Sequence, residues 1–251
     1  MIKIENVVTP SGDQWNSIIM GMRNPMNSWA KSDSLEVAVD DEGTEYIYSI
    51  GPNDHKLLMN LRNAGPSDRK VLRMIPVYLD ITAPLYWWKE FDTYKVGTVA
   101  NSCSTMHKIH AKEFVLEDFS WEHLMGLVVA SDKEYKRSVS GAVTTNTINM
   151  LYEIISCLNT ARAAYLETKD KKYWWQMIQL LPSSYNQKRT IFLNYEVLLN
   201  MYHSRKNHKL DEWRTLCKWI EELPYSEIIT GRETEDLASK SAGKEPEVTD
   251  E

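Results

Sequence analysis

The chain has 251 residues, of which 43% are hydrophobic and 25% are charged, values that are ordinary for a globular protein. A chain of this length can bury a core large enough to fold without a disulfide or metal scaffold. Its formal net charge of −6 offers no basic surface for nucleic acid, and charges and a proline interrupt the longest apolar region, residues 73–91, so no nucleic-acid or membrane partner is expected.

The cysteines stand far apart, at Cys103, Cys157 and Cys217. An odd number of widely spaced cysteines argues against a disulfide framework and favours a reducing compartment. The first residues contain no long apolar stretch and no cleavage site of a secretory signal. We therefore expect a cytoplasmic protein.

The first part of the chain is expected to combine strands and helices. Alternating apolar and polar residues predict a strand over residues 2–8, and the turn that follows can cap a helix from about Gln14. Turn-forming residues at 23–35 indicate a loop. A short strand is expected at Ile47–Ile50, and a helix is expected over residues 55–63.

The middle of the chain predicts the central strand. Residues 71–81 are rich in β-forming side chains with rough alternation, and residues 82–94 follow with apolar side chains at helical spacing. Small and polar residues at 97–105 indicate a loop, and residues 119–129 are expected to be helical.

The second half is expected to be mainly helical, because apolar residues recur there at steps of three and four. The predicted helices cover residues 146–166, 174–181, 190–202 and 210–223. Strands and helices followed by consecutive helices indicate an α+β fold, with helices packed on a mostly antiparallel sheet.

We expect residues 1–230 to form a single domain and residues 231–251 to form an acidic tail. Residues 232–251 hold seven acidic side chains against three basic ones and almost nothing apolar. Such a segment buries too little surface to offset its chain entropy, so disorder is expected there.

The sequence contains no phosphate-loop motif, dinucleotide fingerprint or nucleophile elbow. The spacing of Cys103, His107 and His110 admits a zinc site, and a Cys103 nucleophile with a His base is also conceivable. A buried thiol near two surface imidazoles is the simpler interpretation, and we expect no metal. The tryptophan pairs Trp87-Trp88 and Trp174-Trp175 suit a core or a subunit interface, with an aromatic platform for a flavin or a base as the alternative.

The small polar loop at 97–105 is typical of segments that bring backbone N–H groups and hydroxyls close to an anion. Such a loop needs a cation to complete a phosphate site, and Arg205 can supply one. A solvated arginine is the alternative interpretation.

Two segments together resemble the flavin-dependent thymidylate synthases, and the better match runs from Leu181 to Arg214. In the family a Leu-Pro is followed twelve residues later by an Asn, six residues after that by a second Asn, then by an Arg, a His and a Glu-Ile-Arg-like step into the last helix. The chain has the corresponding residues in this order: Pro182, Asn194, Asn200, Arg205, His208 and Glu212-Trp213-Arg214.

The second segment runs from Leu79 to Cys103. In the family a strand, an Ala-Pro step and a helix lead into an Arg-His-Arg motif, which is followed by a loop with a signature Ser. The same order of strand, Ala83-Pro84 step, helix and polar loop occurs here, so the resemblance spans about residues 55–224.

The resemblance implies an α+β domain that assembles as a homotetramer, with FAD bound between subunits. It implies reductive methylation of dUMP to dTMP, with methylenetetrahydrofolate as the carbon donor and NADPH as the reductant of the flavin. The flavin site that it implies comprises Lys95, Asn194, Asn200 and His208. The nucleotide site that it implies comprises Glu90, Ser102, Cys103, Ser104 and Arg205.

The chain departs from the family pattern at several arginines. The Arg-His-Arg motif falls on Thr93-Tyr94-Lys95, and a lysine cannot reproduce a planar bidentate arginine contact. The signature Ser falls on Cys103, and two further nucleotide-binding arginines fall on Thr105 and near Ile178. Each lost charge-assisted hydrogen bond is worth about 1.5–3 kcal/mol, so dUMP binding is expected to weaken.

Three hypotheses follow. The chain is a divergent flavin-dependent thymidylate synthase, a flavin- or nucleotide-binding relative without methylation activity, or a structural protein that keeps only the fold.

Overall fold

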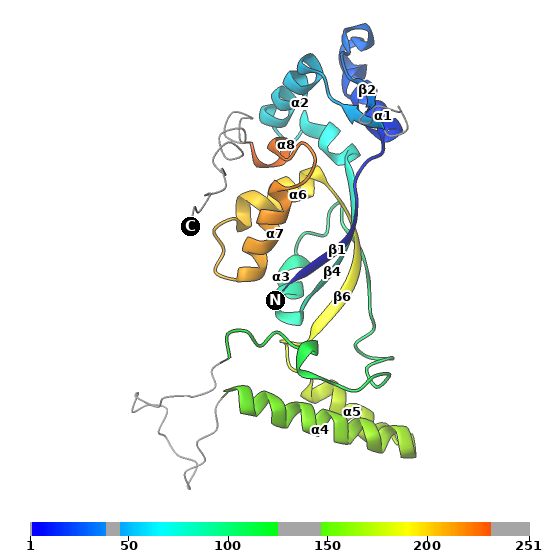
Figure 1. Ribbon diagram of the computed structural model, residues 1–251, viewed down its shortest axis with the longest axis vertical. Coiled ribbons are helices and arrows are strands. Elements are labelled where there is room, and N and C mark those ends of the chain that lie inside the picture. Colours follow the sequence, from blue (N-terminus) through cyan, green and yellow to red (C-terminus); the bar gives the residue numbers. More distant parts are fainter. Residues whose placement is uncertain (1, 39–45, 125–146, 232–251) are drawn as a thin grey trace, which may run out of the picture. The chain divides into compact units, whose positions relative to one another are not determined.

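Segments far apart in the sequence form a four-stranded sheet in the order β1-β4-β6-β5. The computed structural model describes residues 2–38, 46–124 and 147–231 (Figure 1). The strands are β1 (Lys3–Val8), β4 (Pro76–Pro84), β5 (Val99–Ser102) and β6 (Asn186–Asn194). The fold is α+β with an antiparallel sheet, which confirms the predicted class.

The two central strands are buried on alternate residues. Val77, Leu79 and Ile81 of β4 are at most 1% exposed, whereas Tyr78 between them is 49% exposed. Alternate side chains of a strand point to opposite faces, so this pattern marks one covered face. Each central strand runs directly into a helix, β4 into α3 (Leu85–Phe91) and β6 into α6 (Tyr195–Arg205).

The chain divides into two compact units, and both central strands continue from one unit into the other. Unit 1 comprises Met1–Lys3, Ile81–Thr93 and Asn101–Arg189. Unit 2 comprises Ile4–Asp80, Tyr94–Ala100 and Thr190–Glu251. The single domain expected for residues 1–230 stays a prediction.

Unit 1 contains two helices that pack side by side, α4 (Thr147–Thr168) and α5 (Lys171–Leu180) (Figure 1). The Asp170 side chain accepts a hydrogen bond from the Lys172 backbone N–H at 3.0 Å and thereby caps α5. A short 3₁₀ helix, η4 (Leu116–Asp118), lies in the same unit. The buried core of these elements comprises Ile109, Phe114, Phe119, Leu151, Ile155, Leu158, Ala161 and Met177.

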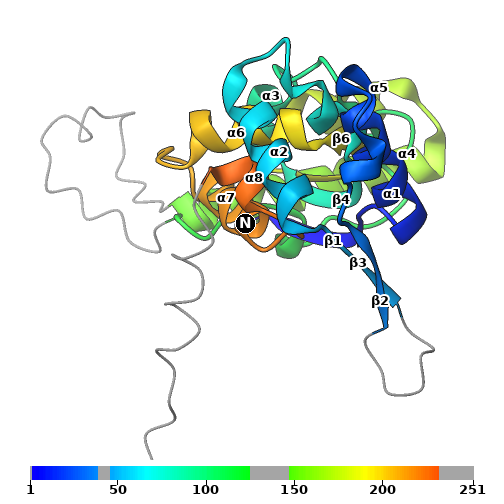
Figure 2. The same cartoon turned by 90° about the horizontal axis from the view of Figure 1, so that it is seen from above.

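Unit 2 contains α1 (Gly12–Arg23), α2 (Pro52–Ala64), α6, α7 (Asp211–Glu221) and α8 (Glu227–Thr230), with 3₁₀ helices η1 (Asn24–Met26), η2 (Trp29–Lys31) and η3 (Arg69–Met74). Ser11 and Gln14 form a capping box that starts α1. The strands β2 (Leu35–Ala38) and β3 (Tyr46–Ser49) form an antiparallel ribbon, which Figure 2 shows extending from these helices.

Several predicted elements are confirmed within one to three residues at their ends. They are the strands at 2–8 and 47–50 and the helices that begin near residues 14, 55, 146, 174 and 210. The helix expected over residues 82–94 is shorter, and the strand expected over residues 71–81 begins as a 3₁₀ helix. The expected tail lies outside the described residues.

Three predicted elements are wrong. Residues 190–194 belong to β6 rather than to a helix, because Ile191 and Leu193 are buried with the period of two that sheet pairing imposes. The loop at 97–105 contains β5, which pairs with β6. Residues 119–124 are not helical, since Phe119 bridges to Tyr185, and residues 125–129 lie outside the described part of the chain.

Candidate functional site

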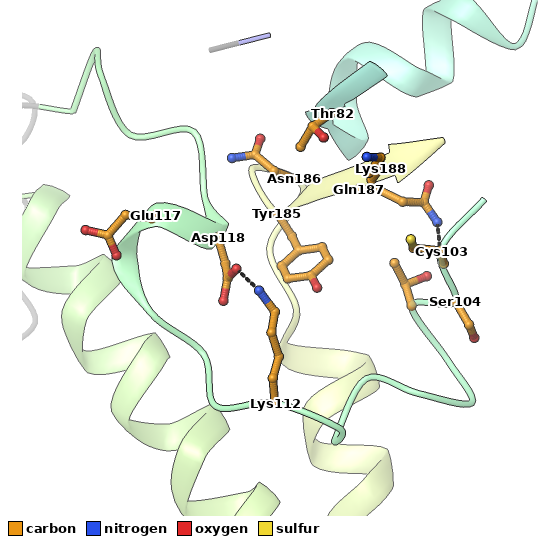
Figure 3. A pocket seen from close by; sticks show the side chains of 11 residues that line it. Thr82, Cys103, Ser104, Lys112, Glu117, Asp118, Tyr185, Asn186, Gln187 and Lys188 are labelled. Carbon is orange, nitrogen blue, oxygen red and sulfur yellow. Dashed lines mark hydrogen bonds and ion pairs between the residues drawn. The ribbon is translucent and has the colours of Figure 1, made fainter. Parts of the chain in front are cut away.

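A cavity of about 230 Å³ in unit 1 contains two of the predicted nucleotide-binding residues, Cys103 and Ser104. Figure 3 shows that its walls come from β6, the segment after β5 and the turn around η4. The lining residues are Thr82, Cys103, Ser104, Thr105, Lys112, Glu117, Asp118, Tyr185, Asn186, Gln187 and Lys188.

Backbone and side-chain hydrogen bonds hold the segment 103–107 in place. The Cys103 N–H donates to the Lys188 carbonyl at 2.9 Å, and the Gln187 amide donates to the Cys103 carbonyl at 2.7 Å (Figure 3). The Ser104 hydroxyl accepts from the backbone N–H groups of Met106 at 3.3 Å and His107 at 2.9 Å. The segment is therefore attached to β6 through the Cys103 N–H, and two more of its backbone N–H groups are bonded within the segment itself.

Positive and negative charges balance around this cavity. Lys112 pairs with Asp118, and Lys188 and Glu117 are the other charged residues of the lining (Figure 3). Asp118 also accepts a hydrogen bond from the Val115 N–H at 3.1 Å, so its position is set by the backbone as well as by Lys112.

Tyr185 lies between the Asp118 side and the Cys103 side of the cavity (Figure 3). Its ring packs edge-on against Phe114 and Phe119, with centroid distances of 6.2 and 5.6 Å. Burial, with smaller contributions from Asp118 and Cys103, raises the pKa of Tyr185 to about 12. The phenol is therefore neutral at physiological pH and can donate a hydrogen bond.

A second cluster of predicted site residues lies in unit 2, where Arg205 is surrounded by aromatic side chains. The Arg205 Nε donates to the Tyr94 hydroxyl at 3.0 Å, and the guanidinium carbon lies 4.7 Å from the ring centroid of Trp213. His208 packs edge-on against the same indole at 6.3 Å, and its Nδ1 accepts from the Leu210 N–H at 3.2 Å. Trp213 thus brings Arg205 and His208 together.

Asn194 is buried at the start of α6 and acts as its N-cap. Its side-chain oxygen accepts a hydrogen bond from the Val197 N–H at 3.1 Å. Gly97, which has a φ of +80°, passes over this helix end so closely that a Cβ there would lie 2.9 Å from the Asn194 amide nitrogen. The Asn194 side chain is therefore fixed by its own backbone environment.

The remaining predicted residues do not join these clusters. Lys95 and Asn200 are exposed in unit 2, and Asn200 lies about 140° around α6 from Arg205 at 100° per residue. In unit 1, Ser102 is exposed on β5 and Glu90 is half-buried on α3.

Sequence reasoning missed the residues that complete the two clusters, namely Tyr94, Lys112, Asp118, Tyr185 and Trp213. Tyr94 occupies the middle position of the altered Arg-His-Arg motif. The sequence therefore pointed to this position but not to its contact with Arg205. Lys112, Asp118 and Tyr185 stand in no recognisable motif, and only tertiary contacts assemble them.

The structure decides between the two interpretations of one tryptophan pair. Trp87 and Trp88 are at most 1% exposed and therefore belong to the core. Trp174 is half-buried and Trp175 is 43% exposed.

The zinc interpretation of Cys103, His107 and His110 has no structural support. Within residues 2–38, 46–124 and 147–231, no three His, Cys, Asp or Glu side chains are placed to hold a metal ion. The same described segments contain no helix that is both long and apolar enough to cross a bilayer.

No protein-family model and no curated protein matches the sequence. The solved structures that are similar to the chain include two of thymidylate synthase X (ThyX) from Helicobacter pylori with FAD and dUMP. One is 15% identical, with a TM-score of 0.59 over 92% of this chain and 97% of the other. The second is 14% identical, with a TM-score of 0.56 over 91% and 96% of the two chains. The chain therefore has the flavin-dependent thymidylate synthase fold, as the resemblance implied.

Proposed function

We propose that this chain binds FAD and a pyrimidine compound related to dUMP. As a relative of the flavin-dependent thymidylate synthases, it no longer catalyses the reductive methylation of dUMP. The contact of Arg205 with Tyr94 and Trp213 carries this proposal. A bidentate arginine grip on a phosphate uses two parallel N–H groups. Here the Nε donor is used by Tyr94, which removes the side-on pair of Nε and Nη donors, and one face of the guanidinium lies against the indole.

The charge balance around the unit 1 cavity supports the same proposal. Thr105 lines the cavity where the resemblance places a phosphate-binding arginine, and two carboxylates oppose the two lysines of the lining. Each missing charge-assisted hydrogen bond removes about 1.5–3 kcal/mol, so two losses weaken dUMP binding by a factor on the order of 10²–10⁴.

The proposed FAD site comprises Lys95, Asn194, Asn200 and His208. Bound FAD would supply hydride-transfer chemistry. The exposed Lys95 and Asn200 suit a cofactor held between subunits of a homotetramer, because their side chains are accessible to groups from outside the chain. Asn194 and His208 suit the inner side of such a site, because hydrogen bonds hold both side chains in place.

A second candidate function is the full reaction, the reductive methylation of dUMP with methylenetetrahydrofolate and NADPH. The observation that favours it is the fold match, which covers 97% of the length of a ThyX structure with FAD and dUMP. The presence of Asn194, Asn200, Arg205 and His208 at the family spacing adds to it.

Flavin content and tritium release test the proposal. We expect the purified protein to be yellow and to release FAD on denaturation. We expect no tritium release from 5-tritiated dUMP in the presence of methylenetetrahydrofolate and NADPH. Tritium release at a rate comparable to that of an active ThyX would establish the second candidate instead, and a colourless protein that FAD does not saturate would refute both.

The variant Arg205→Ala separates the two candidates at one residue. If the Arg205 guanidinium contacts Tyr94 and Trp213 instead of the nucleotide, the variant changes the affinity for dUMP less than about threefold. It then lowers the free energy of unfolding by about 1 kcal/mol. If Arg205 holds the nucleotide, dUMP affinity falls at least tenfold, by about 1.5–3 kcal/mol. NMR titration with dUMP measures the change in affinity, and urea denaturation measures the change in stability. Lys206→Ala is the matched control, because it removes a neighbouring exposed cation.

A further inference from the structure

Part of the backbone donor set next to the unit 1 cavity is already used by contacts within the protein. A phosphate cradle needs free backbone N–H groups. The N–H of Cys103 donates to Lys188, and those of Met106 and His107 donate to the Ser104 hydroxyl. In the loop expected at residues 97–105, the Cys103 N–H is therefore committed to β6, and the Ser104 hydroxyl is the acceptor for the two N–H groups of Met106 and His107 that follow the loop.

The side chains of the cavity add no net positive charge. The Lys112 ammonium pairs with Asp118, and the Asp118 carboxylate is only 11% exposed, so it stays close to any ligand that enters. Glu117 offsets Lys188 in the same lining. A dianion placed here meets two carboxylates for two ammonium groups, and like charges at close range repel strongly where water is partly excluded.

Neutral polar groups are available to a ligand in the same cavity. The hydroxyl of Tyr185 has no hydrogen-bond partner within the described part of the chain, and it stays protonated because burial raises its pKa. The Asn186 side-chain oxygen accepts from Ser120 at 2.8 Å, whereas its amide nitrogen donates to no other described residue. A tyrosine O–H and an amide N–H complement carbonyl acceptors such as those of a pyrimidine ring.

The size of the cavity agrees with a small ligand. Its volume of about 230 Å³ lies below the roughly 300–1,000 Å³ that is usual for sites of drug-sized ligands. It has room for a single base with its sugar.

We propose that the unit 1 cavity binds an uncharged pyrimidine nucleoside in preference to its 5′-phosphate, with Tyr185 as a hydrogen-bond donor and Asp118 as the residue that disfavours the phosphate. This inference rests on the proposed function, because it names the ligand class of a site that the fold resemblance assigns to a nucleotide. It departs from that resemblance by replacing an anion site with a neutral one.

Ligand titration of the full-length, flavin-loaded protein tests the preference directly. Deoxyuridine, dUMP and inorganic phosphate are titrated separately by calorimetry. We expect deoxyuridine to bind at least about tenfold more tightly than dUMP, and phosphate not to compete with it. Equal or tighter binding of dUMP overturns the inference, and so does the absence of deoxyuridine binding.

Two variants locate the effect in the cavity. Asp118→Asn keeps an acceptor for the Val115 N–H and removes the charge, so dUMP affinity should rise about tenfold while deoxyuridine affinity stays within about twofold. Glu113→Gln, an exposed acid outside the lining, is the matched control and should change neither affinity. An equal response of both ligands to Asp118→Asn contradicts its assigned role.

Tyr185→Phe removes the proposed donor and keeps the ring that packs on Phe114 and Phe119. Deoxyuridine affinity should fall about tenfold, whereas Tyr173→Phe, a half-buried tyrosine of the same unit outside the lining, should leave it unchanged. Unchanged affinity in Tyr185→Phe refutes the inference even if Asp118→Asn does not fold.

The outcomes separate this inference from the proposed function. A protein that contains FAD and binds dUMP but not deoxyuridine refutes only the inference. A flavin-free protein that binds deoxyuridine through Tyr185 retains the inference about the cavity and refutes the proposed FAD site.

Discussion

Replacing Asp54 by alanine is expected to lower the free energy of unfolding by about 3–5 kcal/mol, which is a large part of the stability of an ordinary domain. The Asp54 carboxylate is fully buried and pairs with the Arg23 guanidinium, whose side chain is 4% exposed. It also accepts hydrogen bonds from the hydroxyls of Ser32 at 2.7 Å and Ser34 at 2.6 Å. Its loss leaves a buried arginine without its counter-ion.

Urea denaturation at neutral pH measures this effect. Asp211→Ala is the matched control, because it also removes an aspartate paired with an arginine, yet the side chains of Asp211 and Arg214 are 50% and 46% exposed. Exposed pairs contribute about 0–1 kcal/mol, so the control should stay in that range. A loss below about 1 kcal/mol in Asp54→Ala would show that the Arg23 site tolerates an unpaired charge.

The same carboxylate makes stability dependent on pH. Burial acts to raise the pKa of Asp54, but hydrogen bonds from Ser34, Ser32 and Arg23 outweigh it and hold the pKa below its ordinary value. A lowered folded-state pKa stabilises the protein fully above the unfolded-state pKa, about 3.9 for an aspartate. This stabilisation is lost as the pH falls through the lower folded-state pKa, so denaturation between pH 6 and acid pH should show a dependence that Asp54→Asn reduces.

The variant Trp88→Ala is expected to be the second large perturbation, at about 3–5 kcal/mol. Trp88 is 1% exposed and contacts Trp87 and Phe91 at centroid distances of 4.8 and 5.2 Å. Its indole N–H donates to the Gln187 carbonyl at 3.0 Å, and the Arg189 guanidinium lies 4.1 Å from its ring centroid. Truncation removes these contacts together and leaves a void in unit 1.

Thermal and urea denaturation of Trp88→Ala measure the loss, with Trp175→Ala as the control for deleting an indole. Trp175 is 43% exposed, so its truncation should cost less than about 1 kcal/mol. Similar losses in both variants would contradict the assignment of Trp88 to the core. Since Gln187 lines the cavity, the Trp88 variant should also weaken deoxyuridine binding.

The two clusters of candidate residues combine features that support the fold with departures in charge from the family pattern. The apolar alternation of β4 and the helix-capping role of Asn194 depend on packing and backbone geometry, and both are present. The departures from the family pattern concern charge, where Thr105 stands for an arginine in the cavity and Tyr94 holds Arg205. Ligand selectivity is therefore expected to differ more from the family than the fold does.

The sequence by itself determined the fold class and most of the helices. Amphipathic spacing predicted α4, α5 and α7, because a helix repeats its buried face every three to four residues and this period is visible locally. The order of residues from Pro182 to His208 pointed to the flavin-dependent thymidylate synthase fold, which the solved structures confirm.

Only the tertiary structure decided the strand β6 and the composition of the two clusters. Residues 190–194 suit either a helix or a strand locally, and their place between β4 and β5 selects the strand. Tyr94 meets Arg205 across 111 residues, and Gln187 meets Cys103 across 84. Such contacts form because distant segments are brought together by the sheet, and no local period of side chains encodes them.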